Sequence, residues 1–349
     1  MCICKKIMNY DKLKKELLKL SKEEKEQIIE EISLELNTPK PTKSSVIILR
    51  REKLNNKQGK CPYCGNTGYV RYGIDKGSQR YKCKSCKRTF TEYTGTWLDG
   101  IHKKYLADKY IEMMEGKTSL DKIKSRLGIN KKTAFDWRHK ILSSFEDSEK
   151  RRFMGITESD ETFFHLSEKG LKQIIREPRK RGEAASKRGI SDELVAVIVT
   201  ADRNREIDLS VATLGRIKKR DIEKVMDDRI AETTVLCSDG HVSYKGYAMD
   251  KGLEHHAIRV DLKQRVKQKI YHLQHVNNID SRLKKWIQSD FNGVSTKYLQ
   301  NYLNWFRSKE LLKTSENFIK EFKLLSLEDD QTKVRFKSIP LEYVLLMKK

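Results

Sequence analysis

Two pairs of cysteines constrain the fold of this chain more than any other feature. Each pair has C-x-x-C spacing, and residues 65–82 separate the two pairs: Cys61 with Cys64, then Cys83 with Cys86. Each motif points two thiolates at one position, and the segments YVRYG and RYKC between them alternate around a Gly-rich turn. The pattern predicts a zinc ribbon over 58–92. Four thiolates close a tetrahedral site, so we expect one structural Zn²⁺ rather than a catalytic metal.

The charge of the chain indicates a polyanionic partner. The 349 residues include 73 basic and 49 acidic side chains, a net charge of +24. Such an excess favours nucleic acid first and an anionic membrane surface second. No apolar run approaches the roughly 20 residues of a membrane span, which excludes an integral membrane protein. The start MCICKKIMNYDKLKK lacks the apolar core of a signal peptide. We therefore expect a cytoplasmic, nucleoid-associated protein.

Basic residues surround the predicted ribbon. They follow or flank its cysteines: Arg71, Arg80, Lys82, Lys84, Lys87 and Arg88. Such side chains suit contacts to phosphates, although a solvated basic face has the same composition. Before the ribbon, residues 1–45 read as a helical extension with a linker, in which Ser21 and Glu24 form a capping box.

Residues 100–147 predict a helix-turn-helix segment. Helices are expected at about 101–115, 119–127 and 131–145, with Ser119 and Asn130 as caps. The third helix places apolar residues inward: Ala134, Trp137, Ile141 and Phe145. Its outward residues are candidates for DNA contacts: Lys131, Lys132, Thr133, Asp136 and Lys140. An ordinary helical hairpin with a charged face would show the same pattern.

After residue 153 the sequence changes to strands. The segment 155–164 alternates, with Ile156, Glu158 and Asp160 on one face, and the continuous apolar run 194–203 predicts a buried strand. Further strands are expected at 206–214, 234–239 and 255–262, and helices at 217–230, 271–287 and 296–323. This order predicts a mixed α/β sheet with flanking helices over 153–310, followed by a helical tail over 311–349.

A basic segment, 168–190, interrupts this predicted domain. It is rich in Lys, Arg and Gly, and it includes Arg179, Lys180 and Arg181. Two interpretations remain open, an arm that contacts nucleic acid and a disordered surface loop.

Two strand-borne carboxylates suggest a metal site. Asp160 and Asp239 would meet at the sheet edge, where their repulsion calls for a divalent cation. Two Mg²⁺ or Mn²⁺ ions can promote phosphodiester cleavage. A third ligand could come from HLQHVNNIDSRLKKWI, and Lys284 there could contact the phosphate; the candidates in that helix are Asn277, Asn278 and Asp280. The alternatives are a turn role for each Asp, an Asp280–Lys284 pair, and solvated histidines at 272 and 275. Cys237 is expected to be a small buried hydrophobe.

Taken together, these motifs resemble one bacterial family. The ribbon, SDETFF, SDGHVSY and HVNNIDSRLKKW resemble the insertion-sequence transposases of family fifteen-ninety-five over about residues 60–307. The resemblance implies a ribonuclease-H-like catalytic domain with a DDE-type site. Carried over, Asp160 and Asp239 are its first two members. Asn277, with Lys284 seven residues later, is the third, and Asp280 is the alternative.

The function that the resemblance implies is DNA transposition. A homodimer or higher multimer would bind double-stranded DNA at terminal inverted repeats, cut it by Mg²⁺-dependent hydrolysis and join the 3′-hydroxyl to target DNA. Two other hypotheses remain: a non-catalytic DNA-binding regulator with a decayed nuclease-like core, and a structure-selective nuclease.

Overall fold

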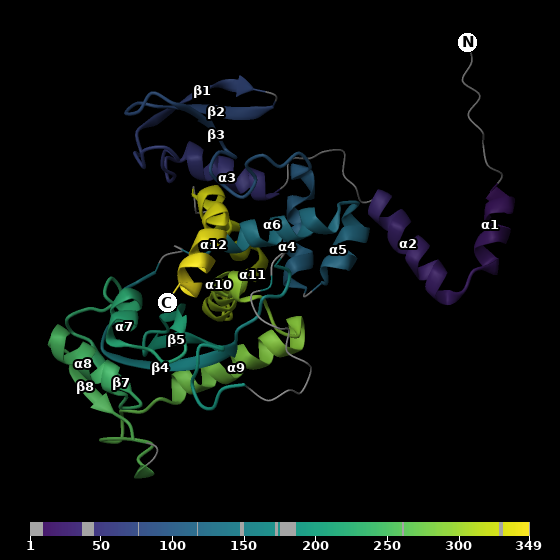
Figure 1. The fold of residues 1–349 in the computed structure, drawn as a ribbon. Coiled ribbons are helices and arrows are strands. Elements are labelled where there is room, and N and C mark those ends of the chain that lie inside the picture. The colour runs from purple at the N-terminus through teal and green to yellow at the C-terminus, as the bar shows by residue number, and fades with distance from the viewer. Residues whose placement is uncertain are drawn as a thin grey trace.

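The protein is described by a computed structural model, shown in Figure 1. The structure describes residues 10–36, 45–75, 77–116, 118–146, 150–171, 174, 186–259, 262–327 and 331–348. Most of the predicted basic segment, including Arg179, Lys180 and Arg181, lies outside these ranges. The first two helices are α1 (Tyr10–Lys19) and α2 (Lys22–Leu36), and the predicted capping box forms between Ser21 and Glu24 at the start of α2.

A small antiparallel sheet holds the four cysteines of the predicted ribbon. Its strands, in the order β1-β2-β3, are β1 (Tyr69–Asp75), β2 (Ser78–Cys83) and β3 (Thr89–Thr91). Tyr69, Tyr81 and Phe90 fill its core, with ring centroids 5.4–5.6 Å apart. Leu54 of α3 (Ser45–Asn55) packs into the same cluster. The sequence predicted no helix at α3, which supplies a hydrophobic base for a sheet too small to bury its own core (Figure 1).

Three helices follow, as predicted for the helix-turn-helix segment. They are α4 (Ala107–Glu115), α5 (Leu120–Leu127) and α6 (Lys131–Ser143). Ser119 Oγ accepts the N–H of Lys122 at 3.3 Å, and Asn130 Oδ1 accepts the N–H of Thr133 at 2.6 Å, so both predicted caps form. Gly128, with φ of 57°, makes the left-handed turn between α5 and α6. The four inward residues predicted for α6 are buried.

A five-stranded mixed sheet forms the second half of the chain. Its order is β6-β5-β4-β7-β8, with β4 antiparallel to β5 but parallel to β7. The strands are β4 (Ile156–His165), β5 (Leu194–Asp202), β6 (Ile207–Leu214), β7 (Val235–Ser238) and β8 (Glu254–Ala257). β5 is buried on both faces, which explains its unbroken apolar run.

Helices cover both faces of this sheet. Ala196 and Ile198 of β5 pack against α7 (Lys219–Met226) and α8 (Val242–Lys251). Val195, Val197 and Val199 face the opposite way, against α9 (Gln274–Phe291) and α10 (Leu299–Leu311). This arrangement confirms the predicted ribonuclease-H-like α/β class.

The last two helices return to the helix-turn-helix segment. They are α11 (Phe318–Leu325) and α12 (Thr332–Met347). Phe322 of α11 and Trp305 of α10 share one core with Trp137 of α6, and α12 lies beside α6 in Figure 1. Among the helices that the structure describes, none is both long enough and apolar enough to cross a membrane.

Candidate active site and metal centre

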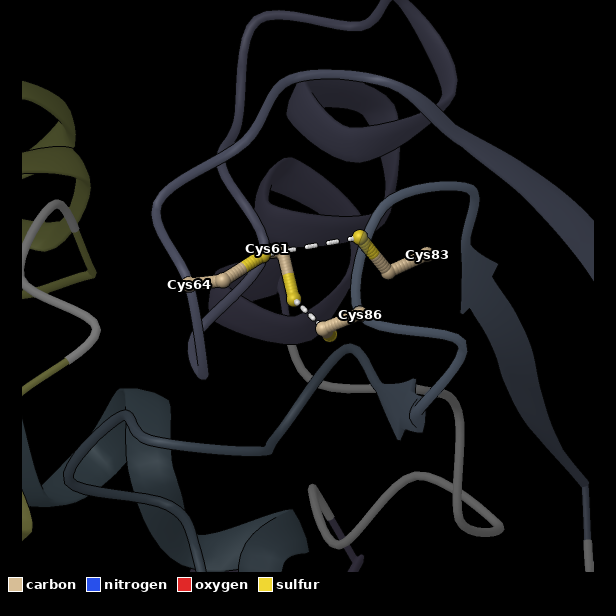
Figure 2. A group of neighbouring side chains, drawn as sticks. All are labelled: Cys61, Cys64, Cys83 and Cys86. Atoms are coloured by element: carbon tan, nitrogen blue, oxygen red, sulfur yellow. Dashed lines mark hydrogen bonds between the residues drawn. The ribbon is translucent and has the colours of Figure 1, made fainter.

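The four cysteines of the ribbon converge on one point (Figure 2). Sγ of Cys61 lies 3.7 Å from Sγ of Cys86, and Sγ of Cys64 lies 3.6 Å from Sγ of Cys83. Tetrahedral coordination with Zn–S bonds of about 2.3 Å requires sulfur atoms about 3.8 Å apart. The residue after each C-x-x-C motif has a positive φ, Gly65 at 71° and Lys87 at 62°, and this turns both motifs inward. The four thiolates therefore have the spacing of a closed tetrahedral metal site.

Asp160 of β4 and Asp239, directly after the neighbouring parallel strand β7, lie close together. The register of β4 and β7 pairs Glu158 with Cys237, and the two aspartates follow two residues later on each chain segment. Asp160, Glu161 and Asp239 each place one carboxylate oxygen within 4.8 Å of the other two. The structure thus brings the two sequence-predicted aspartates together and adds a glutamate to them.

A sharp turn directly after β7 presents Asp239. Gly240 has φ of 88°, and a Cβ there would lie 3.0 Å from Cδ of Arg259. Only glycine suits this backbone and this close approach. Asp239 Oδ1 accepts the N–H of His241 at 2.8 Å, which orders the turn before α8 begins. The exposed carboxylate is therefore held at the carboxyl-terminal end of β7.

The three carboxylates oppose one another electrostatically. Burial and the charge of Asp239 raise the pKa of Asp160 to about 7. Burial, Asp160 and Asp239 together raise the pKa of Glu161 to about 8. Glu161 Oε2 is buried and has no hydrogen-bond partner among the described residues. Such a group retains protons near neutral pH unless a cation compensates its charge.

Helix α9 brings further charges to this cluster. The charge of Asp280 raises the pKa of Asp160, whereas that of Lys284 lowers it. Asp280 and Lys284 form an ion pair at 2.9 Å, and Asp280 Oδ1 is buried without a hydrogen-bond partner in the described part of the chain. Asn277, one turn earlier, has an exposed side chain. Of the residues predicted on this helix, Asp280 and Lys284 are therefore the two whose charges act on Asp160.

A second cluster lies beside the first. Glu158, His272 and His275 place ligand atoms within 4.8 Å of one another, and Arg203 forms an ion pair with Glu158 at 2.9 Å. The two histidines were expected to be solvated side chains of a basic helix. Instead, both contact a carboxylate that is 1% exposed.

The comparisons with known proteins agree with this geometry. Residues 152–309 match the ISXO2-like transposase domain, and this range contains the five-stranded mixed sheet and both side-chain clusters described above. The chain is therefore similar to transposases of this family over these residues. An uncharacterized protein in transposable element ISH50 of Halobacterium salinarum is 28% identical over 278 residues, covering 73% of this chain and 89% of that protein.

One solved structure was also matched by shape. It is the crystal structure of a pre-cleavage Mos1 transpososome, with 10% identity, 67% of this chain and 78% of that chain covered, and a TM-score of 0.24. A score this low does not establish a shared fold. The similarity of this chain to transposases therefore depends on the family match and on the ISH50 relative.

The DNA-contact candidates outside residues 152–309 differ in accessibility. Lys131 and Lys132 are exposed at the start of α6 and form ion pairs with Asp121 and Asp136 at 2.9 and 2.6 Å. Thr133 beside them is half-buried. The exposed Arg88 lies over the ring of Tyr63, with 5.1 Å between the guanidinium carbon and the ring centroid.

Lys140 differs from the outward position predicted for it. Its Nζ lies 5.8 Å from the ring centroid of Phe336 on α12, and burial lowers the pKa of Lys140. Helix α12 covers this part of α6. The periodicity of α6 alone cannot predict this contact, because α12 is distant in sequence. The exposed basic surface of α6 is therefore confined to its first turn.

Two other side chains near these clusters, Cys237 and His241, have structural roles. Burial raises the pKa of the Cys237 thiol to about 11, as expected for an unreactive buried residue. His241 caps α8, because its Nδ1 accepts the N–H of Ser243 at 3.3 Å. Neither residue belongs to the Asp160–Glu161–Asp239 cluster or to the Glu158–His272–His275 cluster.

Proposed function

We propose that this chain is a metal-dependent DNA transposase whose active site is built on Asp160 and Asp239. The observation that carries this proposal is the convergence of the two carboxylates on parallel strands of a transposase domain. A strand edge with two adjacent carboxylates is suited to phosphodiester chemistry with divalent ions.

The donor set fits hard divalent cations. Three carboxylates offer oxygen ligands, and two of them have pKa values raised partly by mutual repulsion, which a bound cation would relieve. Mg²⁺ or Mn²⁺, when bound, would polarise the phosphate and favour ionisation of the attacking oxygen. We expect two ions, held by Asp160 and Asp239, with Glu161 beside them.

For the third ligand, we propose Asp280 rather than Asn277. The buried and unpartnered Oδ1 of Asp280 supports this choice, as does the effect of its charge on the pKa of Asp160. A carboxylate also binds a divalent cation more strongly than a neutral amide does. Asn277 lies one turn earlier on the same side of the helix and is expected to contact the substrate or solvent.

The proposed reaction has two steps, hydrolysis and strand transfer. Water attacks the phosphorus of the scissile bond, and the departing oxygen takes a proton to become a 3′-hydroxyl. This hydroxyl then loses its proton and attacks a phosphorus of the target strand, which forms a new P–O bond to the transposon end and breaks the bond to the target's 3′-oxygen; that oxygen leaves and takes up a proton. Lys284, 49% exposed beside Asp280, can pair with the phosphate under attack.

The remaining parts of the chain suit the binding of double-stranded DNA. The spacing of the sulfur atoms supports one structural Zn²⁺ in the ribbon. Exposed Lys131 and Lys132 can contact phosphates at the transposon ends, and Lys263, Arg265 and Lys269 are exposed on the segment between β8 and α9. Because two ends must be held together, we expect a homodimer or higher multimer on DNA.

Cleavage of the DNA ends tests this proposal. Labelled duplexes that carry the repeats flanking the gene are incubated with the zinc-loaded chain, with and without Mg²⁺. We expect Mg²⁺-dependent nicking at the repeat ends and none on a scrambled duplex. Equal cleavage of both duplexes would indicate a structure-selective nuclease. End binding without cleavage at any Mg²⁺ concentration would indicate a regulator and would refute the proposal.

A further inference from the structure

Glu158 is a buried carboxylate that contacts both the sheet and the start of α9. Its Oε2 accepts the backbone N–H of His275 at 2.8 Å and that of Val276 at 3.3 Å. Its Oε1 lies 2.7 Å from Nδ1 of His275 and 3.3 Å from Nδ1 of His272. The N-cap residue of α9, Leu273, has no side-chain acceptor of its own. Glu158 therefore caps this helix from a strand 117 residues away in sequence.

Arg203 supplies the opposite charge from the turn between β5 and β6. Its Nη2 lies 2.9 Å from Oε1 of Glu158 and donates to the carbonyl of Ile270 at 3.2 Å. Its Nη1 lies 3.0 Å from Nδ1 of His275, and its Nη2 lies 3.2 Å from Nε2 of His272. One carboxylate and one guanidinium thus join β4, the β5–β6 turn, the segment before α9 and α9 itself.

From this cluster, strand and helix extend over similar lengths to the active site. Asp160 follows Glu158 by two strand residues, about 6.6 Å. Asp280 follows His275 by five helical residues, about 7.5 Å. We propose that Glu158, held by Arg203, is a positioning residue that fixes the start of α9 so that Asp280 lies beside Asp160. The inference rests on the proposed function, because it concerns the same metal site.

The three groups of the cluster could also hold a metal ion, but the contacts of Arg203 argue against it. The guanidinium lies within hydrogen-bond distance of Glu158 and both histidines, where a metal ion would lie. Metal binding would require Arg203 to leave. Glu158 would also have to give up at least part of its bonding to the helix amides. We therefore assign the guanidinium as the cation of this cluster.

Three variants of the full-length, zinc-loaded chain test the positioning role. Glu158→Gln keeps an acceptor but removes the charge, and Arg203→Gln is a milder change because this side chain is 31% exposed. Glu254→Gln is the matched control, since Glu254 also contacts a histidine, His256, but is 59% exposed and lies outside the cluster. Mn²⁺ affinity is measured by paramagnetic resonance without DNA, and cleavage of end DNA is measured over a Mn²⁺ series.

We expect both cluster variants to raise the half-saturating Mn²⁺ concentration by about tenfold or more, in binding and in cleavage. The cleavage rate at saturating Mn²⁺ should stay within about twofold of wild type. Amides of His275 and Val276 should exchange hydrogen faster in Glu158→Gln. Glu254→Gln should change none of these. A variant that is only less folded would instead lose maximal rate at an unchanged half-saturating concentration.

Other results would overturn the inference. An unchanged half-saturating Mn²⁺ concentration in both cluster variants would refute positioning while leaving the proposed function intact. A second zinc per chain that disappears in Glu158→Gln would show a metal site in place of the Arg203 contact. A wild-type chain that neither binds Mn²⁺ nor cleaves would refute the proposed function, and the positioning role with it.

Discussion

Asp160→Asn is expected to stabilise the metal-free protein while it weakens the binding of divalent metal. The wild-type carboxyl is held in a half-buried position beside Asp239 and Asp280, and these surroundings raise its pKa from 3.8 to about 7. An asparagine has almost the same shape, and its oxygen can still accept the N–H of Glu161. The substitution therefore removes a charge and preserves the packing.

The pKa of Asp160 gives the sign and the magnitude of the effect. The folded protein retains this proton up to about pH 7, whereas the unfolded chain releases it near pH 3.8, so folding becomes less favourable as the pH rises between these values. At about 1.4 kcal/mol per pH unit, the upper limit is about 4 kcal/mol at pH 8. Because water screens a half-buried group, we expect a gain of about 2–4 kcal/mol for Asp160→Asn at pH 8, and almost none near pH 4.

Urea unfolding at the two pH values measures this gain. Tryptophan fluorescence is a suitable probe, because Trp286 of α9 packs against the cores on both sides of that helix. The buffer contains no Mg²⁺ and no chelator, because a chelator would remove zinc from the ribbon. Asp227→Asn, which removes an exposed partner of Lys251, is the control and should change stability by less than about 1 kcal/mol. An Asp160→Asn gain that is absent at pH 8, or equal at both pH values, would refute the electrostatic argument.

Three further predictions concern the third ligand, the ribbon and the helix-turn-helix segment. Asp280→Ala should lower Mg²⁺-dependent cleavage at least tenfold more than Asn277→Ala; the reverse order would restore Asn277 as the third ligand. Cys83→Ser should remove the one zinc per chain, measured by mass spectrometry, and expose 58–92 to protease; retained zinc would contradict the tetrahedral site. Lys131→Gln should weaken end-DNA binding and reduce its salt slope by about one, and an unchanged slope would exclude a phosphate contact.

Much of the fold could be predicted because local patterns agree with the tertiary structure. The apolar run of β5 and the caps at Ser119 and Asn130 formed as predicted. Helix α8 was not predicted, because Gly246 interrupts it and its amphipathic pattern is weak. In the structure, α8 is stabilised by packing against α7, with Lys219 lying close to Gly246. Helix α8 therefore depends on a tertiary contact that its local sequence pattern does not indicate.

The candidate site could be predicted in part for the same reason. Asp160 lies within the predicted strand 155–164, and Asp239 ends the predicted strand 234–239, so their meeting could be proposed from the sheet. Strand alternation predicts that Glu161 and Asp160 lie on opposite faces, so the sequence offers no reason to expect the carboxylate of Glu161 beside both aspartates. The choice between Asn277 and Asp280 depends on which turn of α9 lies beside the sheet. Helical periodicity cannot make this choice, because it places both residues on the same side of the helix.

Asp239→Ala tests the central claim most directly, because Asp239 is exposed and its removal leaves no buried cavity. Binding and cleavage of labelled end DNA are measured on the same preparation, with Mg²⁺, next to the wild-type chain. We expect end binding within about threefold of wild type and cleavage reduced at least a thousandfold, as for a group that acts in the transition state. Cleavage at the wild-type rate would show that the metal-dependent site is not built on Asp160 and Asp239.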